Sequence, residues 1–306
     1  MEIFLTLLIK LIPLYIFILL GFFAGKYLPV KKAIIASLLI NIIVPVVLFT
    51  AALTTNINLS TLSIPLLFTF ICFVISIATY YGSGFIWKDA TKNIIAFTAA
   101  SANTGYFGLP VAVALFGQPA IGIVALAILG TTIYTNSLGY YIAAKGNHTA
   151  KESLIKVVQL PILYAYILGL IVHALGIHLG KIYFDIANIF NGAYVILGMM
   201  FIGISLAGIN KYKFDLKFIG ITLLTKFLLW PIVMILILSI DSHSLKLYNH
   251  NIYKLLLLLS VLPLAVNIVP YATTLKTQPE KVAFSVLVST IFALFYIPLI
   301  AVFFLR

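Results

Sequence analysis

Long apolar runs constrain the fold of this chain more than any other feature. Stretches of about 20 residues follow one another along the sequence with almost no charge inside them, as in LIPLYIFILLGFFAG at 11–25. This length matches the hydrocarbon core of a bilayer, which is roughly 30 Å thick. Because lipid offers no hydrogen-bond partner, each segment must satisfy its own backbone, and an α-helix does so. The sequence therefore predicts an all-α integral membrane protein.

Composition and charge exclude the main soluble classes. The 306 residues are 63% hydrophobic and 8% charged, with a mean hydropathy of +1.19. The formal net charge of +12 is explained by basic residues that flank membrane segments, so no nucleic-acid partner is expected. The sequence has no phosphate-binding loop, metal-spaced His or Cys cluster, or catalytic constellation, which predicts a protein that is not an enzyme and needs no cofactor or metal. The single cysteine, Cys72, lies in an apolar run, which indicates a packing role.

Ten membrane spans are predicted, with ends defined to within several residues. The first is expected to stay in the mature protein, because it opens with Glu2, lacks a basic leader and is too long for a signal peptide. The longest connections, 145–157 and 240–252, are short and polar, so no soluble domain is expected. The predicted spans are about 3–23, 33–54, 63–87, 93–116, 119–144, 158–177, 185–208, 217–239, 253–274 and 282–305.

The positions of the lysines predict the orientation. With ten spans, one side of the membrane carries most of them, in the connections that hold Lys26, Lys31, Lys32, Lys88, Lys92, Lys145, Lys151, Lys156, Lys211, Lys213, Lys217, Lys276 and Lys281. The other side carries only Lys181, Lys246, Lys254 and Arg306. Cytoplasmic loops are the lysine-rich ones. We therefore expect a multi-pass protein of the cytoplasmic (inner) membrane, with both termini on the periplasmic or extracellular side.

An internal repeat is also predicted. The segments LIPLYIFILLG at 11–21 and QLPILYAYILG at 159–169 share three residues at matched places. The matched pairs are Pro13 with Pro161, Leu20 with Leu168, and Gly21 with Gly169. Five spans in each copy force the second copy to enter the membrane from the opposite side. The sequence thus predicts two five-helix repeats, 1–144 and 145–306, in inverted orientation.

Two spans in corresponding places of these repeats carry helix breakers. The fourth contains SANTGYFGLP at 101–110, and the ninth contains SVLPLAVNIVP at 260–270. Proline lacks a backbone N–H and clashes with the preceding turn, and glycine lowers the cost of unusual dihedrals, so we expect both helices to open near Pro110 and Pro263. Matching breaks in two inverted halves indicate a transport site at the bilayer midplane. The alternative is that these residues only kink the helices and join them to neighbours.

The polar residues at the breaks are the candidate site. Freed backbone groups are tolerated at membrane depth only where they face protein or a polar cavity. Opposed half-helices would point their N-terminal dipoles at one place, where amide and backbone N–H groups can hold an anion without a full opposing charge. The chemistry of the two breaks is therefore suited to an anion. The candidate binding residues are Ser101, Asn103, Thr104, Gly105 and Asn267.

Four motifs together resemble the auxin efflux carrier family, which includes plant auxin exporters and bacterial carriers of malonate and similar acids. NTGYFGLP at 103–110 is similar to the fourth-helix motif, and NIIVP at 41–45 to the second-helix Asn-x-x-x-Pro element. LPLAVNIVPYA at 262–272 resembles the ninth-helix segment, and KFLLWP at 226–231 the basic-to-proline element of the eighth helix. The resemblance implies the five-plus-five inverted repeat of the bile-acid symporter and sodium/proton antiporter folds.

The resemblance also implies an architecture and an assembly. Spans 1, 2, 6 and 7 would form a scaffold, and spans 3–5 and 8–10 a moving transport domain. A homodimer through the scaffold helices is implied, and small residues of the second and seventh spans would allow close approach between helices. These residues are Ala51, Gly198, Gly203 and Gly208.

At the site, the resemblance implies that Pro110 and Pro263 form a crossover of the two broken helices and that Asn103 contacts the substrate carboxylate. Asn41, Lys226 and Pro270 are auxiliary candidates. One departure is clear, because family members often carry a charged pair and an aromatic residue after the ninth-helix alanine. Here these positions are Thr273, Thr274 and Leu275, so a gating role for those charges is not expected.

The ionisable residues offer few candidates for a proton relay. All seven carboxylates lie in connections or at span ends, and Asp185 is nearest to a relay position, although a solvated or capping carboxylate at a helix start is the favoured interpretation. Lys226 is about ten residues into its span, too deep for easy snorkelling, which leaves both a functional and a structural role open. Lys10 is expected to snorkel, and His173 to lie at the surface or in packing.

Three functions remain to be compared. The first is a secondary active carrier for a small carboxylate that works by alternating access, with proton or sodium coupling left open. The alternative is a passive anion channel or facilitator that uses the same crossover as a pore lining. A membrane receptor is disfavoured, because the sequence has no signalling domain.

Overall fold

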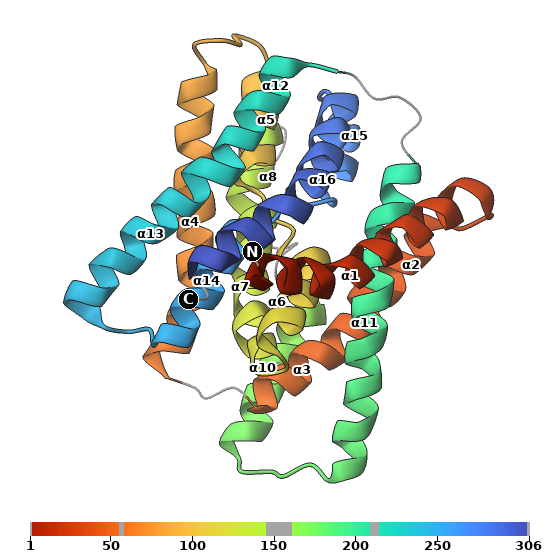
Figure 1. Ribbon diagram of the computed structural model, residues 1–306, viewed down its shortest axis with the longest axis vertical. Helices are drawn as coiled ribbons and strands as arrows, with labels where there is room; N and C mark the ends of the chain where they lie inside the picture. The colour runs from red at the N-terminus through yellow and green to blue at the C-terminus, as the bar shows by residue number, and fades with distance from the viewer. Residues whose placement is uncertain (1, 55–57, 145–160, 209–213, 305–306) are drawn as a thin grey trace.

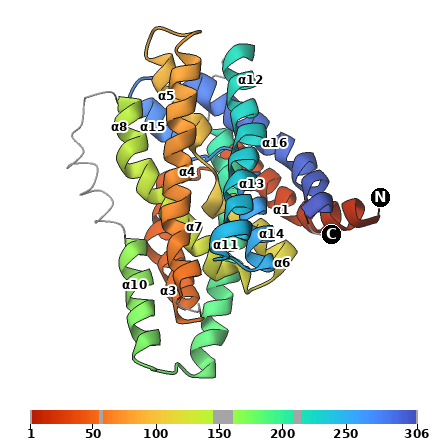
Figure 2. The same ribbon diagram turned by 90° about the vertical axis from the view of Figure 1, so that its left-hand side faces the viewer.

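The computed structural model describes residues 2–54, 58–144, 161–208 and 214–304. Within these ranges the secondary structure is helical, with a single isolated bridge between two extended segments. The helices form an elongated bundle (Figures 1 and 2). Helix α11 lies at one side with α1 crossing it, and α4 with α13 lies at the other (Figure 1).

Several helices contain a π-helical turn, labelled η, that continues directly into the next α-helix. The first half of the chain contains α1 (Glu2–Tyr27), α2 (Lys32–Leu38), η1 (Leu39–Ile43), α3 (Val44–Thr54), α4 (Leu59–Ser83), α5 (Thr91–Ala100), η2 (Thr104–Gly108), α6 (Leu109–Phe116), α7 (Ala120–Tyr134), η3 (Thr135–Gly139) and α8 (Tyr140–Ala144). The second half contains α10 (Pro161–Ala174), α11 (Lys181–Ala207), α12 (Leu216–Leu224), η4 (Thr225–Leu229), α13 (Trp230–Ile240), η5 (Asp241–Leu245), α14 (His250–Ser260), α15 (Ile268–Thr274) and α16 (Pro279–Phe304).

Seven helical stretches among the described residues are long and apolar enough to cross a membrane. They are Leu8–Tyr27, Lys32–Thr54, Leu59–Ser83, Ala120–Ala144, Lys181–Ala207, Leu216–Leu245 and Pro279–Val302. Each coincides with one of the predicted spans, and the chain is a multi-pass membrane protein. The predicted span 158–177 contains the shorter helix α10, and its first residues lie outside the described ranges.

The other two predicted spans are divided. In the range 93–116, α5 ends at Ala100 and η2 begins at Thr104, and in the range 253–274, α14 ends at Ser260 and α15 begins at Ile268. The residues between the two pieces are extended or turn-like, and most of them are buried. The divided pieces are too short to cross a bilayer singly, so only each pair together could do so.

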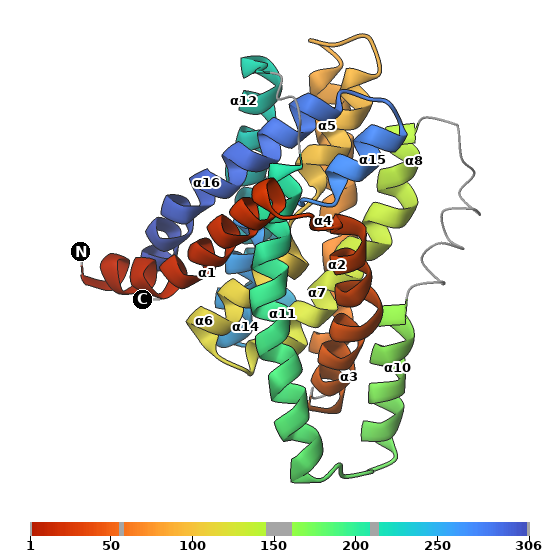
Figure 3. The same cartoon turned by 90° about the vertical axis from the view of Figure 1, so that its right-hand side faces the viewer.

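Glycines set the closest helix contacts. Helix α1 packs along α11, and a Cβ added at Gly21 would lie 2.1 Å from the Met200 carbonyl oxygen. From the opposite side, a Cβ at Gly203 would lie 1.9 Å from the Ile18 carbonyl oxygen. Helix α10 packs on α3 in the same way (Figure 3), and a Cβ at Gly169 would lie 2.6 Å from the Phe49 carbonyl oxygen. Backbones this close leave no room for a side chain.

An ion pair joins the starts of α12 and α16. Asp215 caps α12 by accepting from the Lys217 and Phe218 backbone N–H groups at 3.1 Å, and Lys281 Nζ lies 2.7 Å from its other oxygen. The Lys281 ammonium, together with these backbone donors, holds the pKa of the Asp215 carboxyl below its usual value. The starts of α12 and α16 therefore meet at one end of the bundle.

The expectation about the small residues of the second and seventh spans is corrected. Ala51, Gly198 and Gly203 were expected at a surface between protomers, but all three are buried within the chain, Gly203 against α1 and Gly198 next to Tyr106. Gly208 alone of that set is exposed, as the cap of α11.

Asp185 is a solvated carboxylate near a helix start, which is one of the two favoured alternatives, and it does not cap the helix. Helix α11 begins at Lys181 after Gly180, which places Asp185 inside the helix, where it is exposed. The capping alternative does not apply, because the helix starts about one turn before the predicted span.

Candidate functional site

Two extended segments meet where the divided helices are interrupted. Ala102 forms an antiparallel bridge with Leu264, and the Asn103 backbone N–H donates to the Pro263 carbonyl at 2.9 Å. Pro263 suits this extended place, because it has no backbone N–H that would need a partner. The Leu264 N–H donates to Ser289 Oγ of α16 at 3.2 Å. The backbone groups released by the two breaks thus satisfy one another and a neighbouring hydroxyl.

The first break lies earlier in the chain than the expected position near Pro110. The interruption covers the range 101–103, while Pro110 is buried in the first turn of α6. A proline disturbs the carbonyl four residues before it, which here belongs to Tyr106. The local result is the π-helical turn η2, in which the Gly108 N–H donates to the Asn103 carbonyl at 2.8 Å. The contact between the broken segments therefore involves Pro263 and the range 102–103, and Pro110 is one helix turn removed.

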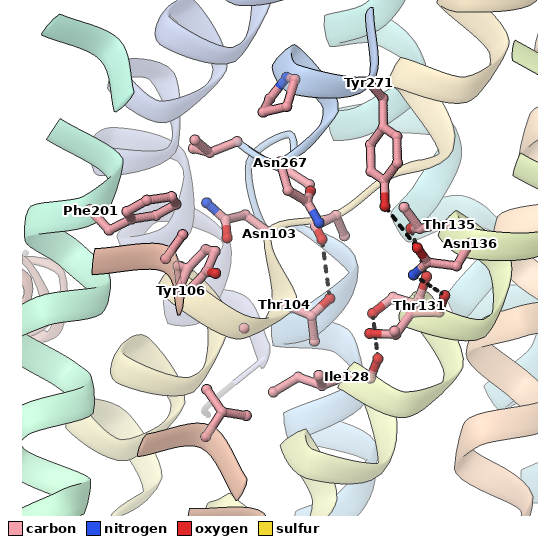
Figure 4. A pocket seen from close by; sticks show the side chains of 18 of the residues that line it. Asn103, Thr104, Tyr106, Ile128, Thr131, Thr135, Asn136, Phe201, Asn267 and Tyr271 are labelled. Atoms are coloured by element: carbon pink, nitrogen blue, oxygen red, sulfur yellow. Dashed lines mark hydrogen bonds between the residues drawn. The ribbon is translucent and has the colours of Figure 1, made fainter. Parts of the chain in front are cut away.

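A cavity of about 680 Å³ opens beside this meeting point (Figure 4). This volume falls within the range of small-molecule sites. The lining combines polar side chains with aromatic ones and contains no carboxylate among the described residues. Of the candidate residues, Asn103, Thr104, Gly105, Asn267 and Pro270 contribute to the wall.

Asn103 presents a free donor to the cavity. Its side chain is 3% exposed, and its Nδ2 is buried without a hydrogen-bond partner. The residue also precedes the first turn of η2, whose backbone N–H groups and dipole favour a negative charge. A buried donor without a partner is costly, so a ligand that accepts from it gains the full hydrogen bond.

Asn267 enters the same wall from the other break. It precedes α15, its side chain makes no capping bond, and it is exposed toward the cavity. Figure 4 shows Asn103 and Asn267 in the middle of the lining, between the Tyr106 and Phe201 rings and the pair of Tyr271 and Asn136. The two amides predicted from separate halves of the chain thus line one cavity.

Helix α7 and turn η3 supply a polar wall that the sequence reasoning missed. Thr131, Thr132, Thr135 and Asn136 line the cavity. Tyr271 on α15 donates to Asn136 Oδ1 at 2.7 Å and packs edge-on against Phe97. The signal was present in the sequence, since these four residues share one helical face of an otherwise apolar span.

Aromatic rings form the opposite wall. Tyr106 of η2 packs on Phe201 of α11 with ring centroids 5.0 Å apart. The Tyr194 hydroxyl lies 3.1 Å from the place that a Cβ on Gly105 would occupy, so the glycine makes space for this ring. The site therefore offers apolar surface to the body of a ligand as well as donors to its charge.

Lys32 is charged, and it is the one such residue among the described residues of the lining. It is half-buried in the first turn of α2. The sequence analysis counted it only as a basic residue flanking a span, and nothing in its sequence neighbourhood distinguishes it from Lys31. Its position gives the cavity a positive charge that no carboxylate of the described lining opposes, which favours an anion.

Five candidate residues lie outside the cavity lining. Ser101 is buried and donates to the Phe97 carbonyl at 2.8 Å, which makes it a helix-end residue. Pro110 and Pro263 are buried, Asn41 is exposed and donates to Ser37 Oγ at 3.0 Å, and Lys226 is fully buried behind the site. Asn41 therefore does not join the site in this structure.

The remaining ionisable candidates lie away from the cavity. Asp185 and Lys10 are exposed and outside the lining. His173 is exposed at the end of α10, and its Nδ1 lies 2.7 Å from the Leu53 carbonyl oxygen of α3. The expectation of a surface position for His173 is thus met.

Comparisons with known proteins point in one direction. The family model described as membrane transport protein matches residues 146–301. An uncharacterized transporter of Methanocaldococcus jannaschii is 26% identical over 297 residues, which cover 93% of this chain and 94% of that protein.

Proposed function

Because this chain belongs to the auxin efflux carrier family of membrane transport proteins, we propose that it is a secondary carrier that moves a small organic anion across the cytoplasmic membrane by alternating access. As a membrane transporter it has no enzymatic role. The substrate would bind in the cavity between the two broken helices, at the crossover of the range 102–103 with Pro263.

The single observation that carries the anion assignment is the buried, unpartnered amide of Asn103. Its Nδ2 can only donate, so the group that satisfies it must be an acceptor. Lys32 adds a positive charge to the same wall, and no carboxylate lies among the described lining residues. A carboxylate ligand satisfies both conditions, whereas a cation satisfies neither.

The helix packing supports the proposed inverted repeat. In an inverted repeat the first span (α1) corresponds to the sixth (α10), and the second span (α3) corresponds to the seventh (α11). A contact between α1 and α11 therefore predicts an equivalent contact between α10 and α3, and both contacts are present. The matched glycines Gly21 and Gly169 occupy equivalent places in these two contacts, each against a backbone carbonyl of the partner helix. A repeat explains why a glycine is needed twice at the same offset.

The same packing supports a division into two bodies. We assign α1, α3, α10 and α11 to a scaffold and the helices around the two breaks to a transport domain. The cavity lining comes from both, with Phe201 and Tyr194 from α11 and Asn103 and Asn267 from the broken segments. A substrate site at the boundary of two bodies can open to either side when one moves against the other.

Transport in proteoliposomes tests the proposal. The purified protein should show saturable counterflow of a small carboxylate from a panel of mono- and dicarboxylates, without an imposed gradient. A conductance far above the turnover of a carrier would favour the channel alternative. A complete lack of transport across the panel would refute an organic-anion carrier.

The proposed orientation has its own test. The lysine-rich α4–α5 connection lies at the opposite end of the bundle from the α13–α14 connection (Figure 1), and Lys88 and Ser242 are exposed in them. In intact cells, an impermeant thiol reagent should label Ser242→Cys and leave Lys88→Cys unlabelled. Cys72 is fully buried and gives no background. The reverse pattern would overturn the assignment of the lysine-rich side, including the 145–157 connection outside the described residues, to the cytoplasm.

We also propose a homodimer through scaffold surfaces. Since the expected small residues are used within the chain, the contact would have to involve exposed apolar side chains of these helices, such as Ile167 and Ile171 on α10 and Ile189 on α11. Mass measurement in nanodiscs should return two copies. A monomer over the whole working concentration range would contradict the dimer.

A further inference from the structure

Lys226 is the most unusual group outside the proposed binding site. It lies in η4, within the membrane-spanning stretch Leu216–Leu245, and its side chain is 0% exposed. Its Nζ has no hydrogen-bond partner and lies 3.7 Å from the centroid of the Trp230 ring. A lysine that only anchored a helix would extend toward the interface, and this one does not.

Among the residues that the structure describes, none supplies a carboxylate partner to Lys226. From α4, the buried thiol of Cys72 interacts electrostatically with the lysine, and Tyr134 of α7 lies next to Cys72 and Ser76. From α16, Tyr296 faces the carbonyl of the neighbouring residue Phe227. The lysines of α5 and α12, Lys92 and Lys217, lie in the first turns of those helices.

Two opposing effects therefore act on the charge of Lys226. Removal from water disfavours the ammonium form, and no carboxylate of the described part of the chain compensates it. The face of the Trp230 ring favours the ammonium form. The C-terminal end of a helix also favours a cation, and α5 ends beside this ring. An amine in this balance can change its protonation state when one further charge arrives nearby.

The structure links Lys226 to the binding site. Trp230 Nε1 donates to the Ala99 carbonyl at 3.0 Å, which ties the ring to the last turn of α5. The segment that follows this turn carries Asn103 and its free amide. The Trp230 ring and its hydrogen bond to Ala99 thus connect Lys226 to the end of α5. The segment that follows this helix end lines the cavity.

We propose that Lys226 is a proton-binding site that couples transport to the proton gradient, so that one proton moves together with each bound anion. The proposal rests on the carrier function proposed above. A proton from water adds to the Nζ lone pair as the anion binds, and it returns to water after the anion has left on the other side. No other bond is made or broken.

The coupling follows from electrostatics and linkage. In a poorly screened interior an anion at Asn103 lowers the free energy of a positive charge at Lys226. By reciprocity, protonation of Lys226 raises the affinity for the anion by the same factor. The protein then carries the two charges together, and for a monovalent anion the loaded step is electrically neutral.

Trp230 provides a direct reporter of this protonation. The chain has only two tryptophans, so Trp87→Phe leaves Trp230 as the single indole. In nanodiscs, the fluorescence emission of Trp230 should change in a single step between about pH 5 and pH 9, because the charge over its ring changes. Lys226→Met, which keeps length and apolar volume, should abolish the titration. If the emission of folded Trp87→Phe protein, in which Lys226 is unchanged, stays constant over this range, the proton site is refuted.

The second arm measures coupling. In proteoliposomes, one unit of pH, acid outside, should drive about tenfold accumulation of a transported monocarboxylate at one proton per anion. Lys226→Met should retain counterflow but accumulate nothing above protein-free liposomes. Lys10→Met, at an exposed position, is the matched control and should behave as wild type. Accumulation by Lys226→Met equal to wild type would overturn the proposal, whereas absent counterflow in wild type would instead contradict the carrier function.

Discussion

Asn103→Asp is expected to weaken the binding of the transported anion by about a hundredfold or more. The change removes the only side-chain donor of Asn103, and a hydrogen bond to a charged group contributes about 1.5–3 kcal/mol. It also places a carboxylate where the charge of the ligand must lie, and in a poorly screened cavity this repulsion adds to the lost bond. Asn103→Ala removes the donor alone and should cost about ten- to a hundredfold. Both constants can be measured by counterflow at varied substrate concentration.

The order of these two variants distinguishes a binding role from a structural one. If Asn103 only supported the fold, both variants would lower expression and thermal stability without a selective change in apparent affinity. Asn251→Asp, the same chemical change at an exposed residue in the first turn of α14, should leave transport unchanged. Wild-type constants for correctly folded Asn103→Ala and Asn103→Asp proteins would show that the cavity amide does not hold the substrate.

The membrane class and the two divided helices could be predicted because they depend on local chemistry. Span length follows from the thickness of the bilayer, and helix breakers act within one turn of where they occur. Asn103, Thr104 and Gly105 are neighbours in one motif, so placing one of them places the others. Asn267 was found through its matched position in the second half, and the structure places it in the same cavity.

The rest of the site depends on tertiary packing. Lys32 appears in the sequence as one of several flanking lysines, and only the position of α2 brings it to the cavity. Tyr271 is oriented by Asn136 and by the rings of Phe97 and Tyr140, which come from three other segments. No local pattern specifies such a set. For Pro110 the local signal was real but its effect was misplaced. The proline was expected to mark the break in the helix, whereas its effect in the structure is the π-helical turn η2.

Gly203→Ala is the second change from which we expect a large effect, in this case on stability. The added methyl group would lie 1.9 Å from the Ile18 carbonyl oxygen and 2.5 Å from the Phe22 backbone nitrogen. Both are backbone atoms of α1, so the contact can be relieved only by moving one helix away from the other. Overpacking usually costs about 1–3 kcal/mol, and a rigid neighbour favours the upper end. The melting temperature of the purified protein should fall by about 3–5 °C.

A matched control exists on the same helix. A Cβ at Gly192 of α11 would meet no heavy atom within 4 Å, so Gly192→Ala adds the same methyl group without a contact. Alanine is favoured over glycine inside a helix by about 1 kcal/mol, and the variant should melt at the wild-type temperature or above it. The difference between the two variants therefore isolates the α1–α11 contact from helix propensity. If Gly203→Ala and Gly192→Ala melt at the same temperature, α1 and α11 do not pack with their backbones in contact, and the matched role proposed for Gly21 and Gly169 in the two repeats loses its structural basis.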